Sequence, residues 1–460
     1  MEILVYLLLG LLIITIELKR ERYFYFDLLT FFHFFYFLVY VFTPIALIIG
    51  GPHLINDDMP FGIFYYHKCA YTPYVILGAY LFFLAGFYWQ KPHYFAKRFE
   101  IRFPAFTLYD LLKILPFAFA FLYAVLFLYT SEFGGIIEAI RQAEAYRSSA
   151  IAFKKFAFVK YFFPLNDILL YTLFYLLYLK KEACCRKWFL FYFFLSILFV
   201  SLKFALNNSR GDLLFTLGGF YVIAAIYHRR FFWKFVWITT LLTIFVLKFA
   251  DPLFGAVAIW IRDGFEAFWN AFITELKIQN AHGSSIISNF THAIVSLDTS
   301  LQSAGYNYPF RYLKDFVNGI TSLVPGQLFG SSSSDLTLME QNTILLSGVR
   351  KEIVLPGILG FLGYAFHAVG IFVGMFVYGT IGAILSEWFS ILYRKYPISL
   401  PILYLYISSY GYFVFRGTII YAIHDNFMLF VVSAILLYFA KIYYRPDPHV
   451  KYYSKNVDLI

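Results

Sequence analysis

Several signatures of well-known catalytic and binding sites are missing from this sequence. Cysteine is scarce: Cys69 stands alone, and Cys184 and Cys185 are neighbours, which gives neither a disulfide framework nor a zinc-site spacing. The chain has no glycine-rich nucleotide-binding loop and no Gly-x-Ser-x-Gly nucleophile elbow. We therefore expect no metal and no cofactor, and an enzyme of this sequence would take its energy from an activated substrate.

Charge is also in short supply. Only 14% of the residues are Asp, Glu, Lys or Arg, whereas 61% are hydrophobic, and the mean hydropathy is +0.69. A soluble protein of this length could not bury so much apolar surface, so the composition predicts an all-α polytopic membrane protein. The net charge of +10 suits the loops of such a protein, and because no RNA- or DNA-binding motif is present we expect no nucleic-acid partner.

Apolar runs close to the length that crosses a bilayer as a helix, about 20 residues, predict about eleven transmembrane spans. The first run has no basic residue before it and no small-residue cleavage site, so we interpret it as a retained span rather than a signal peptide. The predicted spans lie near residues 3–16, 24–49, 73–89, 108–129, 157–178, 189–206, 211–227, 232–250, 369–391, 399–415 and 418–440.

The basic residues predict on which side of the membrane each loop lies. Lys and Arg gather in alternate loops, and such loops remain in the cytoplasm. An odd number of spans then leaves the N-terminus outside and the C-terminal tail in the cytoplasm. The residues that set this orientation include Lys19, Arg20, Arg22, Lys91, Lys97, Arg98, Arg102, Lys180, Lys181, Arg186, Lys187, Arg229, Arg230, Lys234, Arg394, Lys395, Lys441 and Arg445.

The longest outer segment, residues 251–355, is much too long for a simple connector. Within it, apolar residues recur at helical spacing from Ile261 to Leu276, which predicts an amphipathic helix on the outer leaflet or against the bundle. The sequence thus predicts four parts. They are a bundle of about eight spans (1–250), a large outer loop (251–355), a dipping or re-entrant segment (356–368), and the last three spans with a cytoplasmic tail (369–460).

The first of two notable arginines opens the seventh predicted span, on the side opposite the basic loops. Arg210 follows Asn208 and Ser209, which are good N-cap residues. The free N–H groups of a first helical turn, the positive helix end and a guanidinium together suit a phosphate group. Alternatively, Arg210 is an interfacial residue that pairs with Asp212 or reaches the lipid phosphates.

The second arginine, Arg416, has the same setting and is also followed by glycine. Eight residues later, His424 and Asp425 stand inside an otherwise apolar run. Ionisable groups within a span cost about 2.5–3.5 kcal/mol each on insertion scales, so they mark functional sites by default. A structural ion pair of Asp425 with Arg416 or His424 is the alternative interpretation.

The large outer loop holds charged residues that could close an anion site from the loop side. Arg311 lies in a Pro-Phe-Arg-Tyr-Leu-Lys-Asp-Phe segment, and Arg350 and Glu352 directly precede the dipping segment. A solvated charged loop is the alternative for these residues. His367 ends the short dipping helix, where it is either a base or a satisfied structural histidine.

Three blocks of the sequence, taken in order, resemble the Wzy-type polysaccharide repeat-unit polymerases, close to the enterobacterial common antigen branch. The first block is Asn208-Ser209-Arg210-Gly211-Asp212 at the start of a span, and the second runs from Arg311 to Pro325 before a glycine-rich segment. The third is Phe415-Arg416-Gly417 before the last span. The predicted spans and the single large, late outer loop match this family along most of the chain.

The resemblance implies a GT-C-like glycosyltransferase of the bacterial inner membrane that works at the periplasmic face without a metal. Such enzymes transfer a growing glycan from undecaprenyl pyrophosphate to a sugar hydroxyl of the next lipid-linked unit. Donor and acceptor would therefore both be undecaprenyl-pyrophosphate-linked oligosaccharides. The lipid bilayer, a chain-length regulator and a flippase are further expected partners.

The resemblance also implies roles for individual residues. The substrate-binding candidates are Arg210, Arg416, Arg311, Arg350, Asn208 and Ser209. The chain departs from the family where we expect a histidine before the dipping segment, because it has Leu346-Ser347-Gly348-Val349-Arg350 there. The general base therefore stays open. Its candidates are His367, His424, Glu352 and Asp425.

Three other functions are compatible with the sequence. An O-antigen ligase uses the same donor but transfers glycan to lipid A–core. A GT-C enzyme that uses polyprenyl monophosphate sugars would take Asp57 or Asp58 of an outer loop as its base. A lipid-glycan flippase would be a transporter, and the long outer loop counts against it because such transporters favour internal repeats and short loops.

Overall fold

The computed structural model describes most of the chain. The described residues are 2–22, 26–50, 69–103, 107–143, 156–181, 185–207, 210–229, scattered positions between 241 and 260, 263–281, 288–305, 309–321, 323, 336–347 and 354–444. Within these ranges the architecture is helical, apart from the short antiparallel strands β1 (Phe99–Arg102) and β2 (Lys441–Tyr444). The prediction of a helical, polytopic membrane protein is confirmed at this level.

The helices follow one another along the chain with short irregular turns between many of them. The first half contains α1 (Glu2–Lys19), α2 (Leu28–Phe37), α3 (Thr43–Gly50), α5 (Thr72–Phe87), α6 (Gln90–Lys97), α7 (Leu108–Ser131), α8 (Ile136–Arg141), α10 (Pro164–Phe174), α11 (Arg186–Asn207) and α12 (Arg210–His228). The second half contains α14 (Phe265–Ala281), α15 (Ser288–Ser303), α16 (Lys314–Thr321), α17 (Leu338–Ser347), α18 (Gly357–Lys395), α19 (Leu400–Arg416), α20 (Ile419–Asp425) and α21 (Phe427–Phe439). Two π-helical segments, Leu38–Phe42 and Tyr175–Leu179, extend α2 and α10.

Among the described residues, eight helical stretches are long and apolar enough to cross a membrane, and they correspond to eight of the predicted spans. The other three predicted spans differ. α1 forms, but it carries Glu2, Glu17 and Lys19 within 18 residues, which is many charges for a span. The predicted span 232–250 lies almost entirely outside the described residues. The span 418–440 is broken into α20 and α21, which are bent by 60°, so the number eleven stays a prediction.

α18 is broken at His367, whose backbone has left the helical region (φ 60°, ψ −160°). The break falls at the boundary that the sequence predicts between a short helix and the following span. The carbonyl groups in the last turn of a helix lack hydrogen-bond partners within that helix. Here the segment before α16 supplies the missing N–H donors. The backbone N–H groups of Arg311 and Tyr312 donate to the carbonyl oxygens of Tyr364 and Ala365 at 3.2 and 3.1 Å.

Glycines let α18 approach its neighbours closely. A Cβ atom at Gly379 would lie 2.1 Å from the carbonyl oxygen of Phe83 in α5, and one at Gly86 would lie 2.1 Å from that of Phe376. Because lipid tails are as apolar as the helices, close backbone packing rather than the hydrophobic effect holds helix pairs together in a membrane. The close packing of α5 against α18 therefore depends on the absence of side chains at Gly86 and Gly379.

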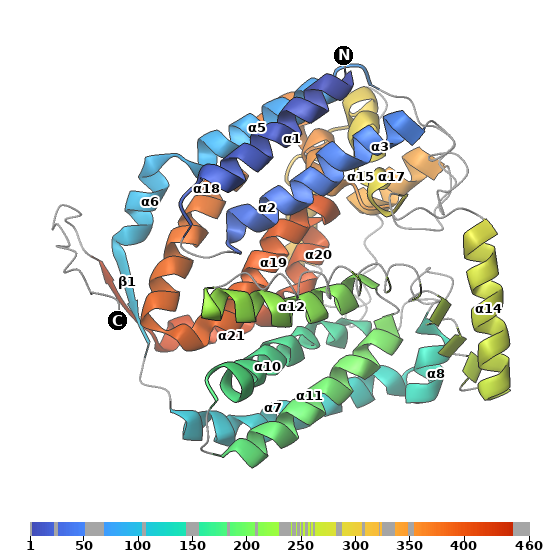
Figure 1. Ribbon diagram of the computed structural model, residues 1–460, viewed down its shortest axis with the longest axis vertical. Coiled ribbons are helices and arrows are strands. Elements are labelled where there is room, and N and C mark those ends of the chain that lie inside the picture. The colour runs from blue at the N-terminus through green and yellow to red at the C-terminus, as the bar shows by residue number, and fades with distance from the viewer. Residues whose placement is uncertain are drawn as a thin grey trace.

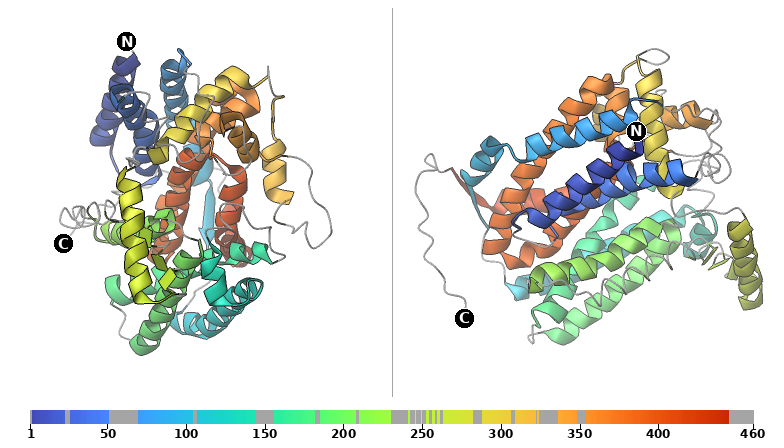
Figure 2. Two further views of the ribbon diagram at one scale, coloured as in Figure 1. Left: turned by 90° about the vertical axis from the view of Figure 1, so that its right-hand side faces the viewer. Right: turned by 45° about the horizontal axis from the view of Figure 1, so that its top comes forward.

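α19 lies between two groups of helices, with α2, α5 and α18 on one side and α10, α11 and α12 on the other (Figures 1 and 2). Tyr404 marks this central position. Its hydroxyl donates to the carbonyl oxygen of Phe215 in α12 at 3.0 Å, and its ring contacts Phe31 of α2 and Tyr171 of α10. Arg416, at the end of α19, is thereby placed between both groups.

We call the two ends of the bundle the Arg416 end, after the last residue of α19, and the Arg394 end, after a basic residue in the last turn of α18. At the Arg394 end, β1 pairs with β2, and two basic side chains of α6 approach α18. His93 and Lys97 lie 3.5 and 3.8 Å from the Glu387 carboxylate. Segments that the sequence assigns to the cytoplasm, the loop after α5 and the tail, thus lie together at this end.

The connection between α1 and α2 is held by a partly buried ionic network at the Arg394 end. Arg20 donates to the carboxylates of Glu17 and Asp27 at 2.9 and 2.5 Å, and the Nδ1 atom of His33 lies 2.7 Å from Glu17. Burial alone would raise the pKa of Glu17, but hydrogen bonds from His33 and Arg20 hold that pKa well below its ordinary value. The Glu17 carboxylate is therefore held in its ionised form between its partners.

The glycine contact between α5 and α18 gives the first prediction. Gly379→Ala should destabilise the protein by about 1–3 kcal/mol, because the added methyl group meets a backbone carbonyl that cannot move aside. Gly218→Ala in α12 is the matched control, since nothing lies within 4 Å of the added atom, and alanine favours a helix by up to about 1 kcal/mol. Thermal unfolding in nanodiscs compares them, and equal melting temperatures for Gly379→Ala and the unmodified protein would contradict this packing.

Candidate functional site

Six ionisable side chains gather near the Arg416 end, where α10, α11, α12, α19 and α20 meet the short 3-10 helix Ala157–Phe162. We call this group the Arg416 cluster. Its members are Lys160, Asp167, Lys203, Asp212, Arg416 and Asp425. Three cations and three carboxylates inside an apolar protein are costly to bury, so a gathering of this kind marks a candidate functional site.

The position of Arg416 is fixed by the backbone that follows it. Gly417 caps α19 in the left-handed conformation (φ 59°), and its N–H donates to the carbonyl oxygen of Phe413 at 2.8 Å. A Cβ atom at Gly417 would lie 1.9 Å from the carbonyl carbon of Gly357, at the start of α18. Position 417 thus requires glycine for two reasons: the left-handed backbone conformation and the close approach of the Gly357 backbone. The contact between these two backbone segments holds the end of α19 in place.

The Arg416 guanidinium has one ionic and two aromatic neighbours. It forms an ion pair with Asp425 at the end of α20, and it lies over the ring of Tyr412, 4.6 Å from the centroid. The ring of Tyr421 is 5.6 Å away on another side. The Arg416 side chain is 22% exposed and that of Asp425 is 51% exposed, so the carboxylate is the more accessible member of the pair.

The second ion pair of the cluster joins α11 to α10. The Nζ atom of Lys203 lies 2.7 Å from Oδ2 of Asp167, and the two side chains are 10% and 17% exposed. The other oxygen of Asp167 is buried without a hydrogen-bond partner among the described residues. Lys203 is also close enough to Arg416 and Asp212 to interact with both charges, which connects the two ion pairs.

Asp212 lies between the cations of the cluster. It attracts Lys160, Lys203 and Arg416 electrostatically, and Asn207 donates to its carboxylate at 3.2 Å. Asp212 lies in the first turn of α12, so the positive end of the helix dipole also stabilises its negative charge. The suggested pairing of Asp212 with Arg210 is not tested, because the side chain of Arg210 is not described.

Aromatic rings flank the cluster. The ring of His424 lies 4.1 Å from that of Tyr161, and Phe427 approaches Tyr161 in turn. Lys160 places its ammonium over the ring of Tyr129, 4.7 Å from the centroid. Rings stacked against cations and imidazole groups are also the surfaces on which sugars and charged head groups rest.

Several site residues predicted from the sequence lie outside the described residues, and for Arg210 only the backbone is described. α12 does begin at Arg210, as the sequence predicts for the start of a span. The residues without a described position are Asn208, Ser209, Arg350 and Glu352. Their proposed roles stay predictions.

Arg311 is held inside the protein by its own neighbours. Its guanidinium donates to Asp315 at 2.6 and 2.7 Å, to the side chain of Gln341 at 2.7 Å and to the carbonyl oxygen of Leu336 at 2.9 Å. Both members of the Arg311–Asp315 pair are buried. This set of bonds ties α16 to α17, and among the contacts described none joins Arg311 to the Arg416 cluster.

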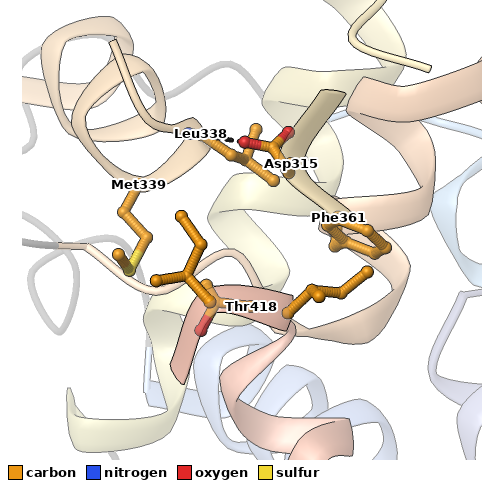
Figure 3. Close-up of a pocket in the computed structure, with 7 residues that line it drawn as sticks. Asp315, Leu338, Met339, Phe361 and Thr418 are labelled. Carbon is orange, nitrogen blue, oxygen red and sulfur yellow. Dashed lines mark hydrogen bonds between the residues drawn. The ribbon is translucent and has the colours of Figure 1, made fainter. Parts of the chain in front are cut away.

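A small pocket lies between this network and the end of α19. Figure 3 shows Asp315, whose carboxylate accepts from the N–H of Leu338 at 3.2 Å, with Phe361 and Thr418 among the other walls. Thr418 is two residues beyond Arg416, and its buried hydroxyl has no hydrogen-bond partner among the described residues. The pocket therefore brings the loop-side helices close to the start of α20, which carries Asp425.

His367 lies at the break in α18. Its Nε2 atom is 3.0 Å from the carbonyl oxygen of Leu301 in α15, and its ring faces that of Phe310. None of the contacts described for His367 reaches the Arg416 cluster. A satisfied structural histidine, one of the two interpretations of the sequence, matches this position.

Sequence reasoning overlooked three members of the cluster: Lys160, Asp167 and Lys203. The signal was present, because each is an ionisable residue within or beside a predicted span, and such residues are expensive there. Asp167 lies inside the predicted span 157–178, and Lys203 lies inside the predicted span 189–206. Arg416 and Asp425 were both chosen from the sequence, and the structure brings them together as an ion pair.

No family model matches this chain, and neither a curated protein nor a solved structure matches it. A function for the chain therefore rests on its own residues and contacts. The described residues contain no group of three or more His, Cys, Asp or Glu side chains placed to hold a metal ion. The side chains described in and around the Arg416 cluster are cations, carboxylates and aromatic rings.

The Lys203–Asp167 pair gives the second prediction. Lys203→Met should lower the free energy of unfolding by about 3 kcal/mol, because it leaves a buried carboxylate without its cation. The double variant Lys203→Met/Asp167→Leu should recover most of that loss, since it removes both charges. Unfolding of the two variants in nanodiscs measures this difference. A single variant as stable as the unmodified protein would show that the pair does not hold α10 and α11 together.

Proposed function

We propose that this protein is a membrane glycosyltransferase that polymerises lipid-linked oligosaccharide repeat units, with the Arg416 cluster as its pyrophosphate site. The proposal rests on the environment of the Arg416 side chain. It is a cation fixed by its backbone, stacked on Tyr412 and balanced by a half-exposed carboxylate. Such an arrangement suits an anion that exchanges with the carboxylate.

Binding of the donor would proceed by that exchange. A pyrophosphate oxygen replaces Asp425 on the Arg416 guanidinium, and charge-assisted hydrogen bonds to phosphate are among the strong ones available. Lys203 adds a second positive charge nearby, and Arg210, at the first residue of α12, is the third candidate. The helix N-terminus at Arg210 offers free N–H groups to the same anion.

The reaction would be a substitution at the anomeric carbon of the donor glycan. A sugar hydroxyl of the acceptor unit forms the new carbon–oxygen bond, and the bond from the anomeric carbon to the pyrophosphate oxygen breaks. The negative charge that develops on the departing undecaprenyl pyrophosphate is stabilised by Arg416 and its neighbouring cations. The hydroxyl proton passes to a base of the protein.

Asp425 is the base that best fits this sequence of events. While the site is empty, Arg416 holds its carboxylate, and donor binding releases it beside the reacting centre. His424 is the alternative from the same helix, where its ring already lies against Tyr161. Glu352 and His367 remain candidates from the sequence, but the contacts of His367 lie with α15 and Phe310.

The loop residues would act in different ways. Arg311 uses its guanidinium to hold α16 and α17, so we assign it a positioning role rather than contact with substrate. Arg350 keeps its proposed place as a cation that closes the site from the loop side.

The same proposal includes the finer topology. The chain would have eleven spans and a GT-C-like arrangement in the bacterial inner membrane, with the Arg416 end in the periplasm and the Arg394 end in the cytoplasm. The gathering of Lys97, Arg394 and the paired strands at one end supports this orientation, because basic loops remain in the cytoplasm.

The third prediction tests the arginine. With purified lipid-linked repeat units and no lipid A–core, the unmodified protein should make a ladder of polymers, whereas Arg416→Ala should abolish it. Arg416→Lys should retain weak activity, because lysine keeps the charge but not the planar fork that binds two oxygens. Arg141→Ala is the control, since Arg141 forms an exposed pair with Glu138 in α8.

Two outcomes of this assay would contradict the proposal. A full ladder from Arg416→Ala would remove Arg416 from the reaction. A product that forms only when lipid A–core is supplied would identify a ligase instead of a polymerase.

The fourth prediction concerns the base. Asp425→Asn should lower kcat by about 100-fold or more, without raising KM for the donor, because Arg416 no longer has a carboxylate to give up. His424→Asn should leave kcat within a few fold of the unmodified value. The reverse pattern, with kcat lost only in His424→Asn, would transfer the role of base to His424.

A further inference from the structure

α16 presents an apolar face to its surroundings. Four large apolar side chains in and beside this helix are between 47% and 64% exposed. They occupy positions i, i+3, i+4 and i+7, which places them on one side of a helix. We call this face the α16 stripe. Its residues are Leu313, Phe316, Val317 and Ile320.

The opposite face of α16 is firmly attached. Asp315 is buried and bound by Arg311. Gly319 lies against α20, where an added Cβ atom would come within 3.0 Å of Ile423 and 3.3 Å of Ile419. The helix therefore cannot turn its stripe inward without breaking a buried ion pair, so the outward direction of the stripe is a fixed property of the fold.

The stripe continues an apolar surface of α18. Tyr312 stands one residue before the stripe, and its ring contacts that of Phe366 at 5.7 Å. From Phe366, exposed apolar side chains run on along α18 at helical spacing, and they are between 46% and 71% exposed. They are Val369, Val373, Val377 and Ile381. Because α18 is long and apolar enough to cross a membrane, this row is a lipid-facing surface.

We propose that α16 lies in the bilayer interface at the Arg416 end, with its stripe immersed in the hydrocarbon of the adjoining leaflet. Eight residues are too few to span a membrane, but a short amphipathic helix can lie in the plane of the interface. The exposed residues beside the stripe, Lys314 and Thr321, suit the head-group level, where a lysine extends its ammonium towards water. The occupant of this surface is the bilayer itself.

This position gives the leaflet a mechanical connection to the Arg416 cluster. α16 rests on α20 through Gly319, and α20 carries Asp425, the partner of Arg416. The leaflet would thus support the helix that presents Asp425. The proposal does not depend on which reaction the protein carries out.

The test measures the surroundings of single side chains. The three native cysteines are replaced by serine, and single cysteines are introduced as Phe316→Cys and Ile320→Cys in the stripe and Lys314→Cys and Thr321→Cys beside it. Each variant carries a nitroxide label and is reconstituted in lipid nanodiscs. Collision rates of the label with oxygen, which concentrates in hydrocarbon, and with a water-soluble nickel chelate are then measured. Val373→Cys in α18 is the control for a lipid-facing site.

We expect the oxygen-to-nickel collision ratio at positions 316 and 320 to be severalfold higher than at 314 and 321 and to approach that at 373. Equal, low ratios at all four positions of α16 would place the stripe in water and overturn the proposal. Protection of 316 and 320 from both reagents would show that protein, such as a second copy of the chain, covers the stripe, and would also overturn it. A low ratio at 373 would remove the lipid-facing surface on which the argument depends.

Discussion

The lack of water inside a membrane is the constraint on which this structure depends. A charge moved into an apolar interior without a partner is costly, and the charges inside this bundle are therefore shared between helices. Lys203 and Asp167 join α11 to α10, and Arg416 and Asp425 join α19 to α20. Each pair fixes two helices relative to each other. The need to pair every charge that enters the apolar interior therefore also determines how these helices are arranged.

Local patterns in the sequence predict much of the fold. The lengths of apolar runs are visible along the chain, and eight spans follow from them. The break in α18 at His367 agrees with a boundary placed where an apolar stretch is too long for one span and too short for two. The pairing of Lys203 with Asp167 is different, because it depends on which faces of α10 and α11 meet, and neither spacing nor composition determines that. The partners of Arg311 show the same limit, because Gln341 and the carbonyl oxygen of Leu336 come from a segment that lies 25 to 30 residues further along the chain.

The Arg416 cluster contains as many carboxylates as cations among its described members, and this balance shapes what it can bind. A site of uncompensated cations would attract any anion but would be costly to keep in an apolar protein. A site of paired charges is stable when empty, and it binds only a ligand that replaces a carboxylate with better geometry. Under the proposed function, selectivity for a doubly charged, oxygen-rich group over a simple ion would follow from that exchange.

The contact between Gly417 and Gly357 limits how this protein can evolve. The two positions are far apart in the sequence, yet neither has room for a side chain. A Cβ atom at Gly417 would meet the backbone of Gly357, and one at Gly357 would meet Tyr40 and Ala293. We therefore expect glycine to be required at both positions. A side chain at either glycine would disturb the contact between the end of α19 and the start of α18, so the position of Arg416 depends on its neighbour Gly417 and on Gly357, which lies far from it in the sequence.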